Sequence, residues 1–443
     1  MGIWDFIKNK GDARSKVVVI GLDGTPYTLI ERFIKDGIMP NLGGIIKRGR
    51  FMQMDSSIPE ISSVAWTTFM TGTNPGEHGI YGFMDFKPDT YNLVFPNSGD
   101  IKAKTVWEIL GEDQKRTVVI NLPSTYPAKE IRGILIAGFV AIDIKKAVFP
   151  SSILPEIEDI GYRIDIDTMK ARESKEYLVE DLNNTLEKRI ETIFHFYEKE
   201  EWDLFIGIIT ETDRLHHFLF DALDDEDHKY HSMFIDYYKR IDKFIGNIYD
   251  RIDKNTRFII LSDHGFCRLE KEVYINQWLK QNGYLRFNKD IPDSYNDIHK
   301  GTRAFALDPA RIYINLKGRF PDGCVENGKE YNRIRDEITE GLLNLDTAIK
   351  RVYRKEEIYS GPYLSLAPDL ILSSKYGYDL KGSIKKGCLM EKGLLTGMHT
   401  QDDALFFINR EMEKEPNRMN IKDVMSIIEG AVVRGQGTGR RNL

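Results

Sequence analysis

Three carboxylates and three imidazoles stand beside apolar runs of this chain. In chain order they are Asp23, Asp213, His217, Asp263, His264 and His399. The carboxyl ends of parallel strands meet at one edge of an open α/β sheet, so side chains that follow such runs converge in space. Mixed sets of aspartate and histidine suit zinc or manganese, and six ligands suit two ions better than one.

Two of these segments also have ordinary structural interpretations. An Asp-Gly pair after a strand, here Asp23 with Gly24, is commonly a turn. Asp213 and His217 are four residues apart, so they share one face of a helix. That spacing fits either a metal site or a polar helix start with surface histidines.

The other two segments depend on where a strand ends. Asp263 and His264 would point to opposite faces of a regular strand. Both reach one site only if the strand stops there, as Gly265 suggests. His399 is expected in a glycine-containing loop just before a strand, where a lone histidine is usually exposed to solvent.

One hydroxyl stands in a position where it can act as a nucleophile. Ser62 and Ser63 precede Val64–Met70, a run with helical character. A serine there is commonly an N-cap. The same geometry turns a hydroxyl toward the free N–H groups and positive dipole end of the helix, where a phosphoryl group binds. Both interpretations stay open at this point.

The elements that must position these residues alternate between short apolar runs and helical patterns, which is typical of a parallel α/β sheet. Predicted strands cover 17–22, 51–55, 117–121, 133–139, 203–209, 257–262 and 403–408. Predicted helices cover 28–35, 40–47, 64–70, 105–110, 173–199, 231–252 and 421–429.

Residues 267–390 have a different character. They contain more turns, several arginines and two extended segments, 311–316 and 368–373, with a helical stretch at 330–344 between them. The pattern indicates an insertion between two parts of one sheet. The last ten residues are rich in glycine and arginine and are predicted to be disordered.

Composition limits the class of protein. The chain has 443 residues, with 62 Lys and Arg against 68 Asp and Glu, so the net charge of −6 gives no overall bias toward nucleic acid. Three cysteines are too few for a disulfide scaffold. The start lacks a signal-peptide pattern and no long apolar run follows, so a cytoplasmic protein without a transmembrane segment is expected. Residues 1–15 are amphipathic and could form a surface helix that touches a membrane or partner.

Five segments together resemble the alkaline phosphatase superfamily, and within it the type I phosphodiesterase/nucleotide pyrophosphatase branch. They are IGLDG, the serine followed by AWTTFMTGTNPGEHGI, TETDRLHH, LSDHG and TGMH, in family order from about residue 16 to about 410. The resemblance implies an α/β fold with a doubly wound, mostly parallel sheet sandwiched by helices. It divides the chain into a discontinuous catalytic core, 1–266 and 391–443, and an inserted α+β cap, 267–390.

The resemblance also implies a metal-dependent phosphoester hydrolase, either a phosphodiesterase or similar to nucleotide pyrophosphatases. It implies two divalent ions, for which zinc is the first candidate and manganese the second. Asp213, His217 and His399 would hold one ion, and Asp23, Asp263 and His264 the other. Ser62 would bridge to the second ion and act as the nucleophile through a phosphoseryl intermediate, with Ser63 as the rival. His78 is expected to be structural rather than a ligand, and His216 either to be structural or to support the ligands from behind.

Substrate choice is expected to depend on the cap. Arg303, Arg311 and Arg319 are candidates for binding a second phosphate or a carboxylate, or are ordinary surface charges. Trp66 either stacks on a base or sugar or belongs to the core. Ala65 stands where nucleotide pyrophosphatases typically carry Asn, three residues after the nucleophile, which leaves the preference for monoesters or diesters open.

Two other functions stay open from the sequence. One is a phosphomonoesterase or phosphomutase on the same core, and the other is a non-catalytic relative with a degenerate site. The complete set of expected ligands argues against the second. The expected partner is a small-molecule phosphoester, no stable nucleic-acid binding is expected, and the oligomeric state is left open.

Overall fold

The computed structural model describes residues 15–345, 347–410 and 418–433. The predicted disordered tail and nearly all of the predicted amphipathic segment at the N-terminus lie outside these ranges. No helix in the described part of the chain combines the length and apolar composition needed to span a bilayer.

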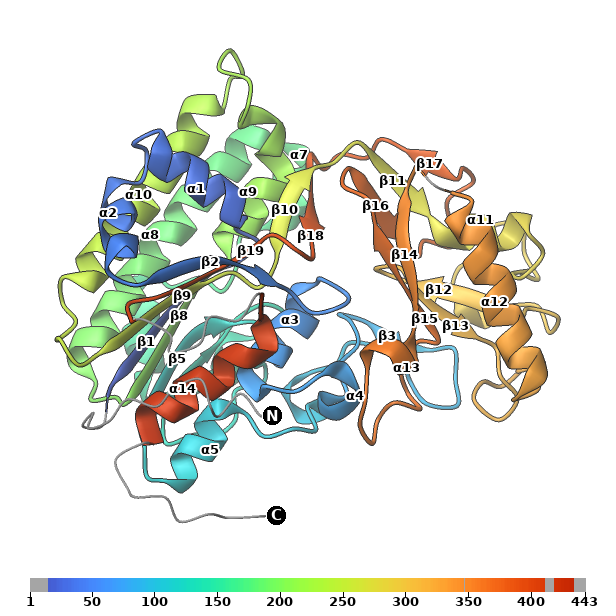
Figure 1. Cartoon of the computed structure of the whole chain (residues 1–443), viewed down its shortest axis with the longest axis horizontal. Coiled ribbons are helices and arrows are strands. Elements are labelled where there is room, and N and C mark those ends of the chain that lie inside the picture. The colour runs from blue at the N-terminus through green and yellow to red at the C-terminus, as the bar shows by residue number, and fades with distance from the viewer. Residues whose placement is uncertain (1–14, 346, 411–417, 434–443) are drawn as a thin grey trace.

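A nine-stranded sheet forms the centre of the larger body (Figure 1). Its strands lie in the order β20 (Met419–Asn420), β2 (Arg50–Asp55), β19 (Ala404–Ile408), β9 (Arg257–Leu261), β1 (Val17–Leu22), β8 (Leu204–Ile209), β5 (Thr117–Leu122), β6 (Gly133–Ala137) and β7 (Val148–Phe149). All neighbours from β9 to β6 are parallel, as are β20 and β2. Only β19 and β7 run antiparallel to their neighbours. The predicted mostly parallel α/β sheet is confirmed.

Helices cover both faces of this sheet, which is why its inner strands β9, β1, β8 and β5 are mostly apolar and buried along their whole length. In β1, Val18, Ile20 and Leu22 pack toward one layer, whereas Val17 and Val19 pack toward the other. The first layer contains α1 (Tyr27–Lys35), α2 (Pro40–Ile45), α6 (Leu154–Ile160), α7 (Thr168–Glu173), α8 (Lys175–Lys199), α9 (Glu211–Leu219) and α10 (His231–Tyr249). The second contains α3 (Ser62–Thr71), α5 (Val106–Glu112) and α14 (Val424–Val433).

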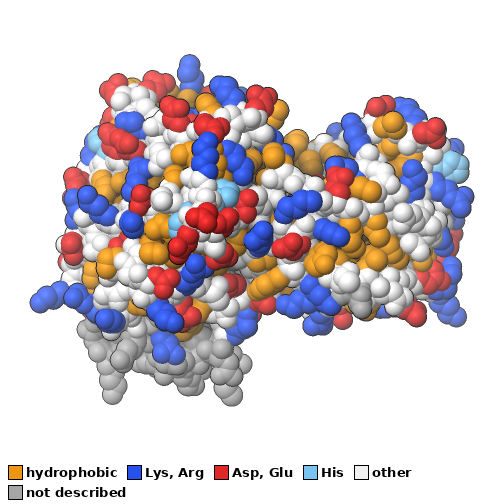
Figure 2. Space-filling view, turned by 90° about the horizontal axis from the view of Figure 1, so that it is seen from above, with side chains coloured by type: hydrophobic (Ala, Val, Ile, Leu, Met, Phe, Trp, Pro, Cys, Tyr) orange, Lys and Arg blue, Asp and Glu red, His pale blue; other side chains and the backbone are white. Residues whose placement is uncertain are grey.

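A smaller body with its own hydrophobic core lies beside the sheet, and Figure 2 shows the outline notched between the two bodies. Its antiparallel sheet has the order β12 (Ala304–Leu307), β13 (Arg311–Ile314), β15 (Leu370–Ser374), β14 (Ile349–Arg354). A second sheet has the order β16 (Tyr378–Lys381), β11 (Lys271–Tyr274), β17 (Met390–Glu391). Helices α11 (Ile275–Gln281), α12 (Lys329–Leu343) and the short α13 (Lys355–Ile358) complete it.

The larger body also contributes to this second core. After the short helix α4 (Pro75–His78), the hairpin of β3 (Asp85–Phe86) and β4 (Leu93–Val94) reaches across to the smaller body. Phe86 and Tyr91 pack there against Phe305 and Phe320. The division of the chain at 267 and 390 stays a prediction, but the packing of the second core includes residues outside that range.

The expectation that His399 lies in a loop is wrong. It belongs to β18 (Gly397–Thr400), which pairs antiparallel with β10 (Gly265–Arg268), so that Phe266 lies opposite His399. The strand has only four residues, too few for a period-two pattern to show in the sequence. This pairing joins the segment after β9 to the segment before β19.

Candidate metal centre

Consecutive strands of the sheet deliver the predicted ligands to one edge. Asp23 directly follows β1, Asp213 lies in the first turn of α9 after β8, and Asp263 and His264 follow β9. The strands β9, β1 and β8 are parallel neighbours, so their carboxyl ends lie side by side. Gly24, in the turn after Asp23, has φ +62°, and a Cβ there would meet the His264 ring at 3.0 Å.

A first group of potential metal ligands joins α9 to β18. His399 Nε2 lies 3.1 Å from Asp213 Oδ1 and 3.0 Å from His217 Nε2. His217 Nε2 lies 3.4 Å from the same Asp213 oxygen, because the two residues are one helical turn apart. These three side chains have the donor types and mutual distances to hold a metal ion.

A second group lies beside the first and shares Asp213 with it. Asp23, Asp213 and His264 have ligand atoms close enough for one ion. Asp263 adjoins this group, with Oδ2 3.4 Å from His264 Nε2, while its Oδ1 accepts a hydrogen bond from the Gly24 N–H at 3.0 Å. Asp263 Oδ2 is buried and has no hydrogen-bond partner among the described residues. All six predicted ligands therefore lie together.

Backbone carbonyls fix the orientation of the three imidazoles. His217 Nδ1 bonds the carbonyl of Gly397 at 3.2 Å, His264 Nδ1 that of Gly265 at 3.0 Å, and His399 Nδ1 that of Glu60 at 2.9 Å. A carbonyl only accepts, so each Nδ1 carries the proton and each Nε2 presents its lone pair toward the group. This arrangement is the one in which histidine binds a metal ion.

The electrostatics of the site favour the binding of a cation. Burial, together with the neighbouring carboxylates, raises the pKa of Asp23 well above its usual range and that of Asp263 to about 7. Burial would also raise the pKa of Asp213, but His217, His399 and Arg214 hold it well below its usual range. Crowded buried carboxylates, an unpartnered carboxylate oxygen and inward lone pairs together fit a divalent cation.

Ser62 points into the second group instead of capping its helix. It is the first residue of α3, and no side chain makes an N-cap bond there. Ser62 Oγ lies 3.3 Å from Asp23 Oδ1 and 3.3 Å from His264 Nε2. The rival Ser63 is also buried, but its hydroxyl has no hydrogen-bond partner among the described residues.

The two histidines expected to be structural are fully buried and lie outside both groups. His216 bonds the carbonyl of Gly24 and the hydroxyl of Tyr238, each at 2.8 Å. His78 bonds the Thr68 hydroxyl at 3.1 Å. Both therefore join elements of the larger body.

A cavity of about 360 Å³ opens beside the first group. The larger body lines it with His217, His399 and Arg214, and the smaller body adds Leu380 and Lys381. Phenylalanines, leucines, prolines and a methionine make up much of the remaining wall. The cavity between the two bodies is therefore where a substrate would reach the histidines.

The four residues predicted to bind substrate do not line this cavity. Trp66 is fully buried, and its indole N–H donates to Asp23 Oδ2 at 2.9 Å, so it orients a ligand residue and offers no face for stacking. Arg311 is fully buried against carbonyl groups of Asp308 and Met84. The structure assigns both to packing.

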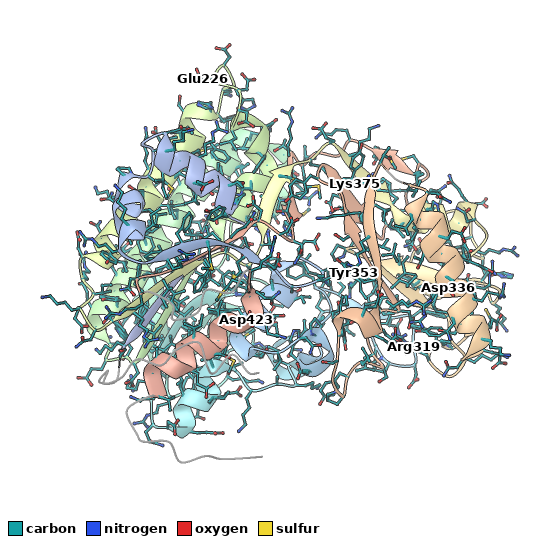
Figure 3. The ribbon with its side chains drawn as sticks, in the orientation of Figure 1. Glu226, Arg319, Asp336, Tyr353, Lys375 and Asp423 are labelled. Atoms are coloured by element: carbon teal, nitrogen blue, oxygen red, sulfur yellow. The ribbon has the colours of Figure 1, made fainter. Side chains whose placement is uncertain are left out.

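The side chains of the other two predicted arginines contact residues of the smaller body. Arg303 lies over the ring of Tyr284, 4.7 Å from its centroid. Arg319 pairs with the buried Asp369 at 3.0 Å, and Figure 3 shows it low on the smaller body. The cavity instead receives its positive charge from Arg172, Arg214 and Lys381, which sequence reasoning missed. Only the position of Arg214 inside the TETDRLHH segment was a usable signal.

Comparisons with known proteins agree with this geometry. The sequence profile of the type I phosphodiesterase/nucleotide pyrophosphatase family matches residues 17–402. The fold is similar to that of phosphonoacetate hydrolase from Sinorhizobium meliloti 1021, solved with phosphonoacetate, at 18% identity and a TM-score of 0.65 over 97% of this chain and 99% of that one. It is also similar to murine ectonucleotide pyrophosphatase/phosphodiesterase 5, solved as an inactive variant with AMP, at 15% identity and a TM-score of 0.57 over 94% of this chain and 95% of that one.

These structural likenesses establish the fold, whereas the profile establishes the family. No protein of curated function gives a significant sequence match. The profile covers most of the chain, including every segment that carries a predicted ligand. The chain belongs to the type I phosphodiesterase/nucleotide pyrophosphatase family of phosphoester hydrolases.

Proposed function

We propose that this protein hydrolyses a small-molecule phosphoester with Ser62 as the nucleophile, at a centre that binds two divalent metal ions. Asp213, His217 and His399 would hold one ion. Asp23, Asp263 and His264 would hold the other, with Ser62 beside it. The observation that carries the proposal is the Ser62 hydroxyl, held 3.3 Å from both Asp23 and His264 while leaving its helix uncapped.

The residues of the centre divide the chemistry between them. When bound, zinc or manganese supplies positive charge that lowers the pKa of the Ser62 hydroxyl and neutralises the phosphoryl oxygens. Ser62 Oγ then attacks phosphorus as the P–O bond to the leaving group breaks, which gives a phosphoseryl group. Water hydrolyses that group and restores the hydroxyl. The N-terminus of α3 adds its positive dipole end to the same place.

Zinc is the first candidate for the metal and manganese the second. The first group contains two imidazoles and one carboxylate, a donor set typical of zinc. The second group contains more carboxylate, which manganese also accepts. Activity measured separately with each metal, on phosphate monoesters and diesters, tests the metal and the substrate class together.

Replacing the hydroxyl tests the nucleophile. We expect Ser62→Ala to lower turnover by at least ~10³-fold, because the attacking atom is removed. Metal content should stay as in the parent, since the other ligands remain. Ser63→Ala is the matched control and should retain most of the activity. Near-normal turnover by Ser62→Ala, or its loss in Ser63→Ala alone, would contradict the assignment.

A further inference from the structure

The residue that follows the shared ligand on α9 faces the cavity. Arg214 comes directly after Asp213 and lines the cavity together with His217 and His399. Its side chain is 15% exposed, so the guanidinium is largely buried and still reached from the cavity. Arginine keeps its charge in such a place. A permanent cation therefore stands beside the first group of ligands.

Contacts on several sides fix the orientation of this guanidinium. Nη2 bonds Asp165 Oδ2 at 2.7 Å, and Nε lies 3.2 Å from both oxygens of the same carboxylate. Nη1 bonds Asp213 Oδ2 at 3.0 Å. The ring of Phe139 covers one face, 4.5 Å from the ring centroid to the guanidinium carbon. The group is thus held in place before any substrate arrives.

These bonds leave donors unused. A guanidinium carries five N–H groups, of which two belong to each Nη. Among the described residues, the bonds to Asp165 and Asp213 use one N–H on each Nη. The remaining pair can donate to two oxygens of one anion, the geometry in which arginine binds phosphate most strongly.

The other cations of the cavity are placed differently. Lys381 pairs with Asp379 at 2.5 Å on the smaller body. Arg172 is an exposed residue of α7, and it lies more than 40 residues before Asp213 in the sequence. Arg214 alone among these three contacts a residue of the metal groups.

We infer that Arg214 is a substrate-binding residue whose free Nη1 and Nη2 hydrogens bind non-bridging oxygens of the phosphoryl group. The inference rests on the proposed function, because Ser62 and the metal ligands define where that phosphoryl group lies. It assigns phosphate binding to a side chain on α9. Ala65 on α3 has no polar side chain for that role, and Arg303, Arg311 and Arg319 do not line the cavity.

Binding of inorganic phosphate tests the inference without turnover. The parent is the full-length Ser62→Ala protein loaded with zinc, and affinity is measured by calorimetry. We expect Arg214→Gln to weaken phosphate binding at least ~10-fold, and Arg214→Lys by at least ~3-fold, because lysine keeps the charge but loses the paired donors. Arg303→Gln is the matched control and should change the affinity less than about twofold.

Metal content separates substrate binding from support of Asp213. Zinc per chain is measured on the same samples, and we expect the Arg214 variants to keep the parent's content. Phosphate affinity within about twofold of the parent in both variants would overturn the inference. So would a loss of phosphate binding that only follows a loss of zinc. If Arg214→Gln does not fold, the phosphate affinity of Arg214→Lys alone tests the inference. A zinc-loaded parent that binds no phosphate would overturn the proposed function and this inference together.

Discussion

Each imidazole of the centre is bonded to the backbone on the side away from its ligand position. The carbonyls of Gly397, Gly265 and Glu60 hold the three rings. Burial lowers the pKa of His217 to about 4, so its Nε2 is an unprotonated ligand at neutral pH. A ligand held in this way gives up little conformational freedom when the metal ion binds.

Removing one imidazole should empty one metal position. We expect His217→Ala to bind about one ion per chain less than the parent, because the first group then keeps only one nitrogen ligand. Metal content after dialysis, measured by mass spectrometry, gives the number. His195→Gln is the control, since His195 pairs with Glu156 at 2.7 Å away from both groups. Unchanged metal content in His217→Ala would contradict the assigned ligand.

The clustering of the predicted ligand residues was accessible to sequence, because their types and their positions after strands carry the signal. Asp23 and Asp213 follow apolar runs, so parallel strands bring them together. Arg214 and Phe139 escaped prediction for a physical reason. Their roles depend on the direction of a side chain and on contacts across more than 70 residues of sequence, which no local pattern encodes.

At the scale of elements, the placement of α9 depends on a buried ion pair. Arg189 of α8 bonds Glu211 of α9 at 3.0 Å and 3.2 Å, and both side chains are fully buried. Arg189 also bonds the carbonyl of Ile164 at 2.7 Å. Since Asp213 and His217 lie on α9, this pair fixes the helix that carries two ligands.

Neutralising one partner should destabilise the protein. We expect Glu211→Gln to lower the free energy of unfolding by about 3 kcal/mol, because Arg189 keeps a buried charge without its counterion. Glu191→Gln on α8 removes an exposed pair with Lys188 and should cost at most ~0.5 kcal/mol. Urea denaturation measures both variants. Equal losses of unfolding free energy in the two variants would show that the buried pair contributes no more to stability than the exposed pair.

Asp369, which directly precedes β15, is a buried carboxylate that pairs with two cations. It is paired with Arg319 and Lys355 at 3.0 Å each, and it accepts bonds from the Tyr331 hydroxyl and the Ile314 N–H. Burial raises the pKa of its carboxyl, but Arg319, Lys355 and the bonds from Tyr331 and Ile314 together lower it further than burial raises it, so the pKa lies below the usual value.

A depressed carboxyl pKa fixes the sign of a pH effect. The stabilisation by Asp369 is fully present above its unfolded pKa of about 4 and is lost as the pH falls through the lower folded value. We expect Asp369→Asn to be less stable than the parent at pH 7, and the difference to shrink below about pH 4. Chemical denaturation at several pH values measures it. A stability difference between the variant and the parent that does not change with pH would contradict an ionised Asp369 in the folded protein.

Elements were predictable wherever a periodic pattern was long enough. The predicted strand at 17–22 is β1 residue for residue, and the predicted helix at 231–252 is α10 with a shorter end. The helix predicted over 173–199 begins at Lys175, because Ser174 adopts an extended conformation and caps α8. β18 was missed, since its partner β10 lies more than 125 residues earlier in the chain.

On the scale of the whole molecule, the metal ions should act as a stabilising ligand. Without a cation, the fold must keep Asp23, Asp213 and Asp263 buried together. Each ion that binds only the folded state adds about 2.7 kcal/mol at 100 times its dissociation constant. For a chain of 443 residues this corresponds to a rise in Tm of roughly 3 °C per ion. Calorimetry with and without a chelator measures it, and an unchanged Tm would argue against two buried ions.

The arrangement of the two bodies was the part of the fold least accessible to sequence. The separate character of residues 267–390 was visible in their composition, but the contact of Phe86 with Phe305 was not. The cavity is formed by both bodies at once. Its shape follows from tertiary packing, so the sequence could not show that Arg303, Arg311 and Arg319 lie outside its wall.

The position of His399 on β18 also has a consequence for biosynthesis. The first group of potential ligands includes this histidine, which follows Asp23 by more than 370 residues of sequence. During synthesis, Asp23 and α9 therefore leave the ribosome before β18 does, and the group stays incomplete until β18 pairs with β10. In the proposed centre, the first metal position is complete only after β18 has formed, so a chain that stops before His399 would lack one of its ligands.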